Sequence, residues 1–384
     1  MTKQNSPLVL GTERIGKLLT QYAIPAIIAM TASSLYNMAD SIFIGHGVGP
    51  LAISGLALTF PLMNLAAAFG SLVGVGASTL VSVKLGQKDY EGANQVLGNV
   101  LVLNVLLGLA FTFVFLLLLD PILYFFGASE NTIGYARDYM QIILYGNVIT
   151  HMYLGLNAVL RSSGFPKQAM YATLASVVIN CILNPIFIFG FEWGIKGSAW
   201  ATVISQVISL TGQMIHFSSS KQLLHFKKGI YKLRKEVVKG ILYIGMSPFL
   251  MNLCSCLIVI LINRGLKEHG GDMAIGAYGI VNRIIFLFVM IIMGFNQGMQ
   301  PIAGYNFGAR LYPRVTEVTK LTMKWAIGVA TAGFLLCQLF PTLIVNMFTT
   351  DDELVKAAVF GLHIVFAVFP IVGFQMVATN FFLS

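Results

Sequence analysis

The chain has 384 residues, of which 57% are hydrophobic and only 10% are charged. Soluble domains carry about 25% charged residues, so this composition excludes an ordinary soluble protein. The net charge of +9 is spread over many short polar segments, which argues against a nucleic-acid footprint. All four cysteines lie in apolar stretches, and their positions indicate neither a disulfide framework nor a zinc site.

Apolar stretches of membrane-spanning length follow one another along the chain, at about 20 residues or more each. They cover residues 18–44, 53–83, 96–119, 133–160, 170–191, 197–217, 238–262, 274–305, 316–340 and 354–382. The first stretch is too long for the apolar core of a signal peptide, so we expect it to be retained. The sequence therefore predicts an all-α integral membrane protein with about ten spans.

The basic residues are distributed unevenly between the two sets of connecting segments. With a cytoplasmic N-terminus, most of the 24 Lys and Arg residues lie in the inner segments. The outer segments then hold only Arg137, Lys196, Arg264, Lys267 and Lys356. Cytoplasmic loops of membrane proteins carry such an excess of positive charge. The sequence thus predicts a multi-pass protein whose N-terminus faces the cytoplasm.

The longest basic run, residues 221–239, separates an N-terminal lobe (1–220, six spans) from a C-terminal lobe (240–384, four spans). This linker has two interpretations, a solvated connection with a topological role or a segment that binds anionic lipid headgroups. One constant shift along the sequence relates the two lobes. It pairs Leu35 with Leu257, Gly49 with Gly271, Ile53 with Ile275, Gly76 with Gly298, Gly86 with Gly308, Tyr90 with Tyr312, and Phe126 with Phe348.

The pairing predicts a parallel internal repeat of two six-helix lobes, because an even number of spans starts both lobes on the same side. The second lobe lacks counterparts of the last two spans of the first lobe in this chain. We therefore expect the native product to continue beyond Ser384 with two more spans.

Asp40 is the only acidic residue well inside a predicted span, in the segment SSLYNMADSIFIG (33–45). A bare carboxylate in hydrocarbon is costly, so such a residue usually faces an interior cavity. Tyr36 and Asn37 precede it by one helical turn and lie on the same face. The phenol, amide and carboxylate together favour a site for H⁺ or Na⁺. The alternative is that Asp40 lies near the outer end of its span, as a wetted residue or a local cap.

A second polar cluster lies in the fifth predicted span. Asn180 and Asn184 are four residues apart and share a helix face. Pro185 leaves a carbonyl of the preceding turn without its helical partner, and interrupted helices of this kind border ion sites in transporters. Interhelical amide hydrogen bonding is the alternative. Thr202 and Gln206, one turn apart in the next span, are placed to complete the same pocket.

Residues with catalytic chemistry do not cluster. His151 and His363 stand alone within predicted spans. The glycine-rich segments 74–87 and 294–309 lack the lysine arrangement of a nucleotide-binding loop, and close helix packing accounts for them. We therefore expect a protein that is not an enzyme and needs no cofactor.

Four segments in combination resemble the multidrug and toxic compound extrusion (MATE) family, in particular its prokaryotic branch with an Asp in the first span. They are YNMADSIFIG (36–45), LNAVLRSSGFPKQAM (156–170), NPIFIFG (184–190) and GFNQGMQPIAGYNFGA (294–309). The resemblance implies two six-helix lobes around a V-shaped cavity that opens alternately to the two sides of a bacterial plasma membrane. It also implies that a monomer exports cationic amphipathic drugs and dyes in exchange for H⁺ or Na⁺.

The resemblance also implies a set of site residues in the first lobe. By motif position, the cation site of the family falls on Tyr36, Asp40, Asn157, Asn180, Asn184 and Thr202. A bound Na⁺ would use Asp40, Asn180 and Thr202. Pro25 matches the proline that bends the first span, and Pro185 marks a second bend. Many relatives carry Asp where this chain has Asn184, so the site would hold one negative charge instead of two.

Two other functions remain as alternatives. A lipid-linked sugar flippase of the wider superfamily would favour cationic residues along the cavity, and Arg283 is the one basic residue at mid-span. An integral-membrane enzyme would need His, Asp or Glu at catalytic spacing. The sequence favours the antiporter, with small cationic substrates and membrane lipid as partners.

Overall fold

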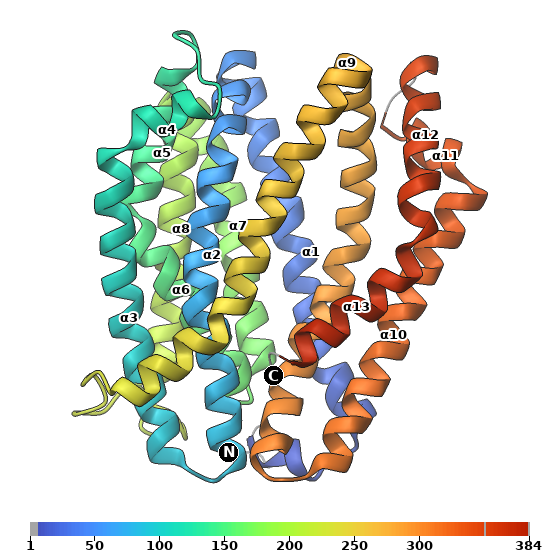
Figure 1. Cartoon of the computed structure of the whole chain (residues 1–384). Helices are drawn as coiled ribbons and strands as arrows, with labels where there is room; N and C mark the ends of the chain where they lie inside the picture. The colour runs from blue at the N-terminus through green and yellow to red at the C-terminus, as the bar shows by residue number, and fades with distance from the viewer. Residues whose placement is uncertain (1–6, 349–350, 383–384) are drawn as a thin grey trace. The chain divides into compact units, whose positions relative to one another are not determined.

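The computed structural model describes residues 7–348 and 351–382, and the described residues contain helices and connections but no strand (Figure 1). In chain order the helices are η2 (Pro7–Gly11), α1 (Ile15–Gly47), α2 (Pro50–Gly86), α3 (Tyr90–Leu117), α4 (Leu119–Phe125), α5 (Ile133–Tyr145), α6 (Asn147–Ser162), α7 (Pro166–Pro185), η3 (Ile186–Gly190), α8 (Gly194–Ser218), α9 (Lys235–Gly308), α10 (Tyr312–Leu339), α11 (Pro341–Asn346), α12 (Asp352–Ala367) and α13 (Phe369–Phe381). The predicted all-α class is confirmed.

Helices of membrane-spanning length account for most of the predicted spans. Among the described residues, 7 helical segments are individually long and apolar enough to cross a membrane. The count rises to 9 when α5–α6, bent by 55°, and α12–α13, bent by 50°, are each taken as one span. The remaining predicted span, 197–217, is the helix α8, whose face Ser198, Thr202, Ser205, Ser209 and Gln213 is polar and buried. Its polar residues are turned into the protein, which explains why α8 is less apolar than its neighbours.

The predicted outer connection 263–273 is helical instead of a loop. The helix α9 runs through this segment, from Lys235 to Gly308. Two stretches of α9, Lys235–Ser255 and Ala277–Gly308, each qualify as a membrane span.

Contacts divide the chain into two compact units, and the division passes through η2, α1 and α9. The first unit comprises residues 1–9 and 32–253, and the second comprises residues 10–31 and 254–384. The first unit therefore holds α1 from Ala32 onward and the start of α9. The lobe boundaries and the repeat inferred from the sequence stay predictions.

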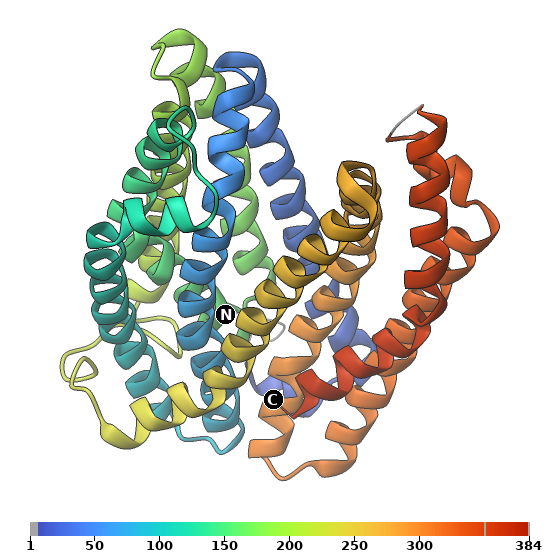
Figure 2. The ribbon, with the colours of Figure 1, turned by 45° about the horizontal axis from the view of Figure 1, so that its top comes forward.

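Within the first unit, α2 packs against α3, α5 and α6, and α6 also packs against α7 and α8 (Figures 1 and 2). The start of α9 lies on α2 with the two backbones in contact. A β-carbon at Gly76 would overlap the carbonyl of Ile241, and one at Gly245 would overlap the carbonyl of Leu72. Small residues of this kind let membrane helices approach closely.

The segment between α8 and α9 is held on the first unit by amide side chains of α3. Gln95 Nε2 donates to the carbonyls of Ile230 (3.0 Å) and Lys232 (2.8 Å). Asn99 Oδ1 accepts from the backbone N–H of Arg234 at 3.0 Å. This basic linker is therefore fixed along its last residues, just before α9 begins.

In the second unit, α10 packs against α12 and α13, and the end of α9 lies against the first part of α1. A β-carbon at Gly298 would come within 2.7 Å of the backbone nitrogen of Ala23. Arg314 joins the N-terminal segment to this unit, because its Nη2 donates to the carbonyl of Leu10 at 3.1 Å and its Nε to Asn306 Oδ1 at 2.9 Å. Pro25 lies inside α1, in the part that belongs to this unit.

Candidate functional site

The Asp40 carboxylate is buried in the first unit, where its side chain from α1 meets α7 and α8. Asp40 is 5% exposed. Its Oδ1 accepts a hydrogen bond of 2.8 Å from Asn184 Nδ2 and one of 2.5 Å from Ser198 Oγ. The buried hydroxyl of Tyr139, on α5, also interacts with this carboxylate. Asp40 is thus enclosed by protein, which argues against the alternative that it is exposed to water at the end of its span.

A chain of neutral polar groups extends from Asp40. Asn184 Nδ2 also donates to Asn180 Oδ1 at 2.6 Å, and Asn180 Nδ2 donates to Thr202 Oγ1 at 3.1 Å. The Tyr36 hydroxyl and Thr202 Oγ1 are hydrogen-bonded at 2.9 Å. The structure therefore brings together five of the residues implied by the family resemblance.

Helical spacing explains why these groups meet. Tyr36 and Asp40 are four residues apart on α1, as are Asn180 and Asn184 on α7, and residues at this spacing share a helix face. Ser198 and Thr202 form the corresponding pair on α8. Pro185 ends α7 directly after the second asparagine, and the chain continues as the π-helix η3. The interruption predicted from the proline is present at this site.

The charge of the cluster is that of one carboxylate. Asp40 interacts with Asn184, Ser198 and Tyr139, and all three side chains are neutral. Within the part of the chain that the structure describes, no group of three or more His, Cys, Asp or Glu is placed to hold a metal ion. The arrangement therefore does not fit a transition metal, and it offers one negative charge surrounded by neutral oxygens.

One buried oxygen of the cluster has no hydrogen-bond partner. It is Asn184 Oδ1, whose residue is fully buried. An unsatisfied buried acceptor is costly in a protein interior. Hard cations prefer oxygen ligands, and the Asn184 and Asn180 amide oxygens, the Thr202 hydroxyl and the Asp40 carboxylate supply them. The residues present therefore fit Na⁺ as well as H⁺.

Asn157 lies apart from this hydrogen-bond chain. Its Nδ2 donates to the carbonyl of Ala169 at 2.9 Å and to Thr173 Oγ1 at 3.4 Å. Thr173 lines a polar cavity of about 140 Å³, and Tyr36 forms part of the same wall. Asn157 thus reaches the wall of this cavity through its hydrogen-bond partner Thr173. Gln206 also lines the cavity and accepts a hydrogen bond from Thr150 at 2.5 Å.

Sequence reasoning missed two partners of Asp40. Ser198 could have been found from its position one turn before Thr202 on the same helix face. Tyr139 carries no comparable signal, since only the packing of α5 brings it to the carboxylate. The side chain of Asn37, which the sequence placed beside Asp40, lies outside the described residues.

A multi-pass helical protein with one buried carboxylate where three helices meet has the features of a secondary transporter. The chain belongs to the MatE family, whose model matches residues 25–186 and 244–384. This match confirms the resemblance seen in the sequence.

Individual relatives agree with the family. The chain is 31% identical over 352 residues to "Multidrug export protein MepA" of Staphylococcus aureus (strain MSSA476), covering 91% of this chain and 77% of that protein. It is 32% identical over 356 residues to the protein of the same name from Staphylococcus haemolyticus (strain JCSC1435), with the same coverage. These relatives are transporters and not enzymes.

Solved structures show the same fold. An outward-facing multidrug resistance MATE family transporter of the MOP superfamily superposes with a TM-score of 0.92 at 24% identity, covering 100% of this chain and 85% of that chain. A MOP superfamily transporter from Pyrococcus furiosus Vc1 (DSM3638) gives a TM-score of 0.91 at 25% identity, with the same coverage.

Proposed function

We propose that this chain is a secondary active antiporter that exports cationic amphipathic compounds in exchange for H⁺ or Na⁺ by alternating access. The names of its relatives, multidrug export protein and multidrug resistance transporter, support the export of drugs. The observation that carries the coupling is the burial of Asp40 among neutral donors.

Burial of this carboxylate makes the cluster responsive to a cation. An ionised carboxylate away from water is unfavourable unless it is hydrogen-bonded and compensated. Asn184 and Ser198 supply hydrogen bonds but no positive charge. Either a proton on Asp40 or a Na⁺ held by Asp40, Asn180, Asn184 and Thr202 would neutralise it. Occupancy by a cation therefore changes the charge of the first unit by one.

Exchange of cation for drug follows when the change of charge at Asp40 favours either the inward-open or the outward-open state. A ligand shifts a conformational equilibrium only by its differential affinity for the two states, and two ligands that favour different states oppose each other's binding. In the antiporter, the inward-directed cation and the exported drug play these roles. The Tyr36 hydroxyl is placed to connect them, because it bonds to the cluster through Thr202 and also lines the neighbouring polar cavity.

That cavity is smaller than a drug site. Its volume of about 140 Å³ is below the roughly 300–1,000 Å³ of pockets that enclose drug-sized ligands. We therefore assign it to the ion pathway in this state, with drug binding in a state where the space is wider.

The membrane arrangement is part of the proposal. We infer a bacterial plasma membrane protein that acts as a monomer, with two six-helix lobes and a cytoplasmic N-terminus. A cysteine introduced at Gly47 or Ser129 should then react with an impermeant reagent added outside intact cells. One at Gln87 or Ser219 should not react, and the reverse pattern would overturn the orientation.

The function is tested by transport in vesicles. Purified protein is reconstituted, and movement of a fluorescent organic cation is followed while a pH gradient and a Na⁺ gradient are imposed separately. The proposal expects movement of the dye against its own gradient under at least one of them. No gradient-driven movement of any tested cation would contradict it, and movement of a lipid-linked sugar analogue instead would identify a flippase.

A further inference from the structure

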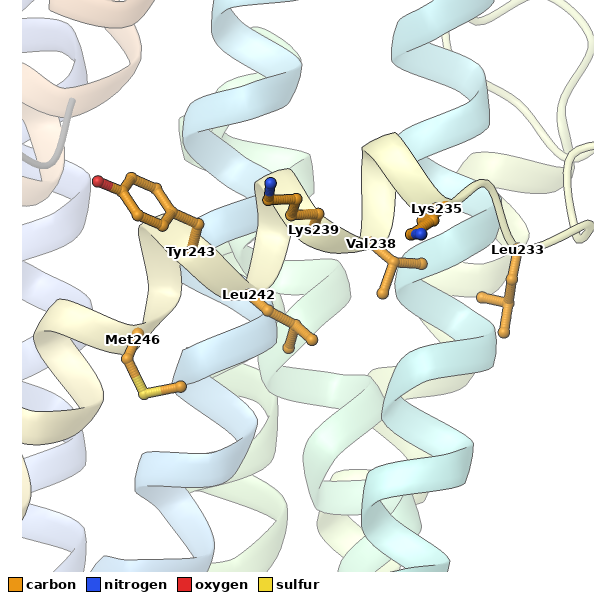
Figure 3. A pocket seen from close by; sticks show the side chains of 7 residues that line it. All are labelled: Leu233, Lys235, Val238, Lys239, Leu242, Tyr243 and Met246. Carbon is orange, nitrogen blue, oxygen red and sulfur yellow. The ribbon is translucent and has the colours of Figure 1, made fainter.

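A groove of about 700 Å³ runs along the first turns of α9, on the surface of the first unit (Figure 3). Its walls come from the last linker residues and from α9, between Leu233 and Met246. Leu233 and Lys235 lie at one end, Val238, Lys239 and Leu242 follow in the middle, and Tyr243 and Met246 lie at the other end (Figure 3). Both lysines are therefore in the part of the groove nearer the linker, and its far end carries no charged side chain.

Helix geometry keeps this face of α9 away from the protein core. The residues that face α2 are Ile241, Gly245 and Phe249, which follow one another at helical spacing. The groove stripe, Val238, Leu242 and Met246, is offset from them by one residue. Side chains of α3 hold the backbone of the linker just before Lys235, so the groove is preformed.

The two lysines of the groove are exposed, and none of the ion pairs among the described residues involves Lys235 or Lys239. Lys232 and Arg234 precede them and Glu236 lies between them in the sequence, so residues 232–239 carry four positive charges and one negative charge. The groove thus presents exposed ammonium groups, with a net positive charge, beside an apolar surface.

The position of the groove along α9 matches the depth of a lipid. The segment Lys235–Ser255 qualifies as a membrane span, and the protein leaves most of it uncovered. Lys235 begins this segment, and Met246 lies about 16 Å farther along the helix axis at 1.5 Å per residue. Tyr243 is 82% exposed, and tyrosine is enriched at membrane–water interfaces because its ring is apolar and its hydroxyl is polar.

We propose that this groove binds an anionic phospholipid. The phosphate lies against Lys235 and Lys239, and an acyl chain lies along Val238, Leu242 and Met246. Lysine stems extend over apolar surface while their ammonium groups stay at headgroup level, and basic segments at this level attract anionic lipids. The occupant is a membrane lipid because the apolar part of the groove belongs to a membrane-spanning segment.

Native mass spectrometry of the full chain tests this site. The purified protein is mixed with equal amounts of phosphatidylglycerol and phosphatidylcholine that have the same acyl chains, and retained lipid is counted. We expect preferential retention of phosphatidylglycerol. In the double variant K235Q/K239Q, the affinity of the protein for phosphatidylglycerol should fall by about thirtyfold, because each lysine near the membrane surface contributes about fivefold. The matched control K221Q/K228Q removes two exposed linker lysines outside the groove and should change it little.

A second experiment distinguishes binding of a whole lipid from binding of its phosphate headgroup alone. Glycerol 3-phosphate at the same concentration should not displace the lipid, and Met246→Ser should weaken retention of phosphatidylglycerol while the variant still elutes as a folded monodisperse protein. Equal retention of both lipids, or equal losses in the two lysine variants, would overturn the site. A dimer that K235Q/K239Q dissociates would assign the groove to a second copy of the chain and would likewise overturn it.

Discussion

The hydrogen bond from Ser198 to Asp40 gives a quantitative test of the coupling site. Ser198→Ala removes the donor at 2.5 Å and leaves Asn184 in place. The backbone carbonyl of Ser198 still accepts from Thr202, so the helix itself is unchanged. A hydrogen bond to a charged group contributes about 1.5–3 kcal/mol, and each 1.4 kcal/mol is about a tenfold change in an equilibrium. The protonated form of Asp40 should therefore gain about tenfold to a hundredfold over the ionised form.

The assay is dye efflux from vesicles, measured as a function of the driving cation. Under a pH gradient, half-maximal efflux by Ser198→Ala should occur at a proton concentration at least about tenfold lower than for wild type. Maximal efflux should slow because the proton leaves less readily. Ser209→Ala is the control, since Ser209 is also buried on α8 but its hydroxyl has no hydrogen-bond partner. The same cation dependence in Ser198→Ala and wild type would refute the assignment of Asp40 as the coupling group.

Two other substitutions test the electrostatics. Asn184→Asp places a second carboxylate at hydrogen-bond distance from Asp40. The two carboxylates should titrate jointly, so transport should persist with a shifted pH optimum. An unchanged pH profile of transport would place residue 184 outside the site. At the start of α3, hydrogen bonds from the Lys84 ammonium and the Gly92 N–H hold the pKa of Asp89 below its usual range. This carboxylate stabilises the fold above its unfolded pKa of about 3.9, and its contribution disappears as pH falls through the lower folded value. Because the pair is partly exposed, Asp89→Asn should cost only about 0.5 kcal/mol at neutral pH. In thermal unfolding, the difference from wild type should shrink steadily as the pH is lowered below about 3.9. A difference that does not change with pH would show that the charge is not the cause.

The membrane helices could be predicted because apolar length is a local property of the sequence. The stretches around α2, α3 and α10 stand out by composition alone. The helical connection within α9 could not, because the polar and charged residues between the two apolar stretches read as a loop in the sequence. The polarity of α8 is likewise explained only when Ser198 and Thr202 are seen facing α1 and α7.

In the site, too, some residues could be recognised from the sequence and others only from the structure. Pairs one turn apart on one helix, such as Asn180 and Asn184, could be recognised from spacing. The contact of Tyr139 with Asp40 depends on how α5 packs, and no local pattern signals it. Asn157 was inferred from a motif, and only the structure shows that its amide bonds to α7. Their roles in cation coupling stay predictions.

Efflux by Asp40→Asn tests the central claim most directly. The variant keeps the size of the side chain but cannot ionise, so the cluster no longer changes charge when a cation arrives. In vesicles under a pH gradient or a Na⁺ gradient, we expect the variant to be folded and to retain dye binding, with no efflux driven by either gradient. Efflux at the wild-type rate under either gradient would show that Asp40 is structural and would contradict the account.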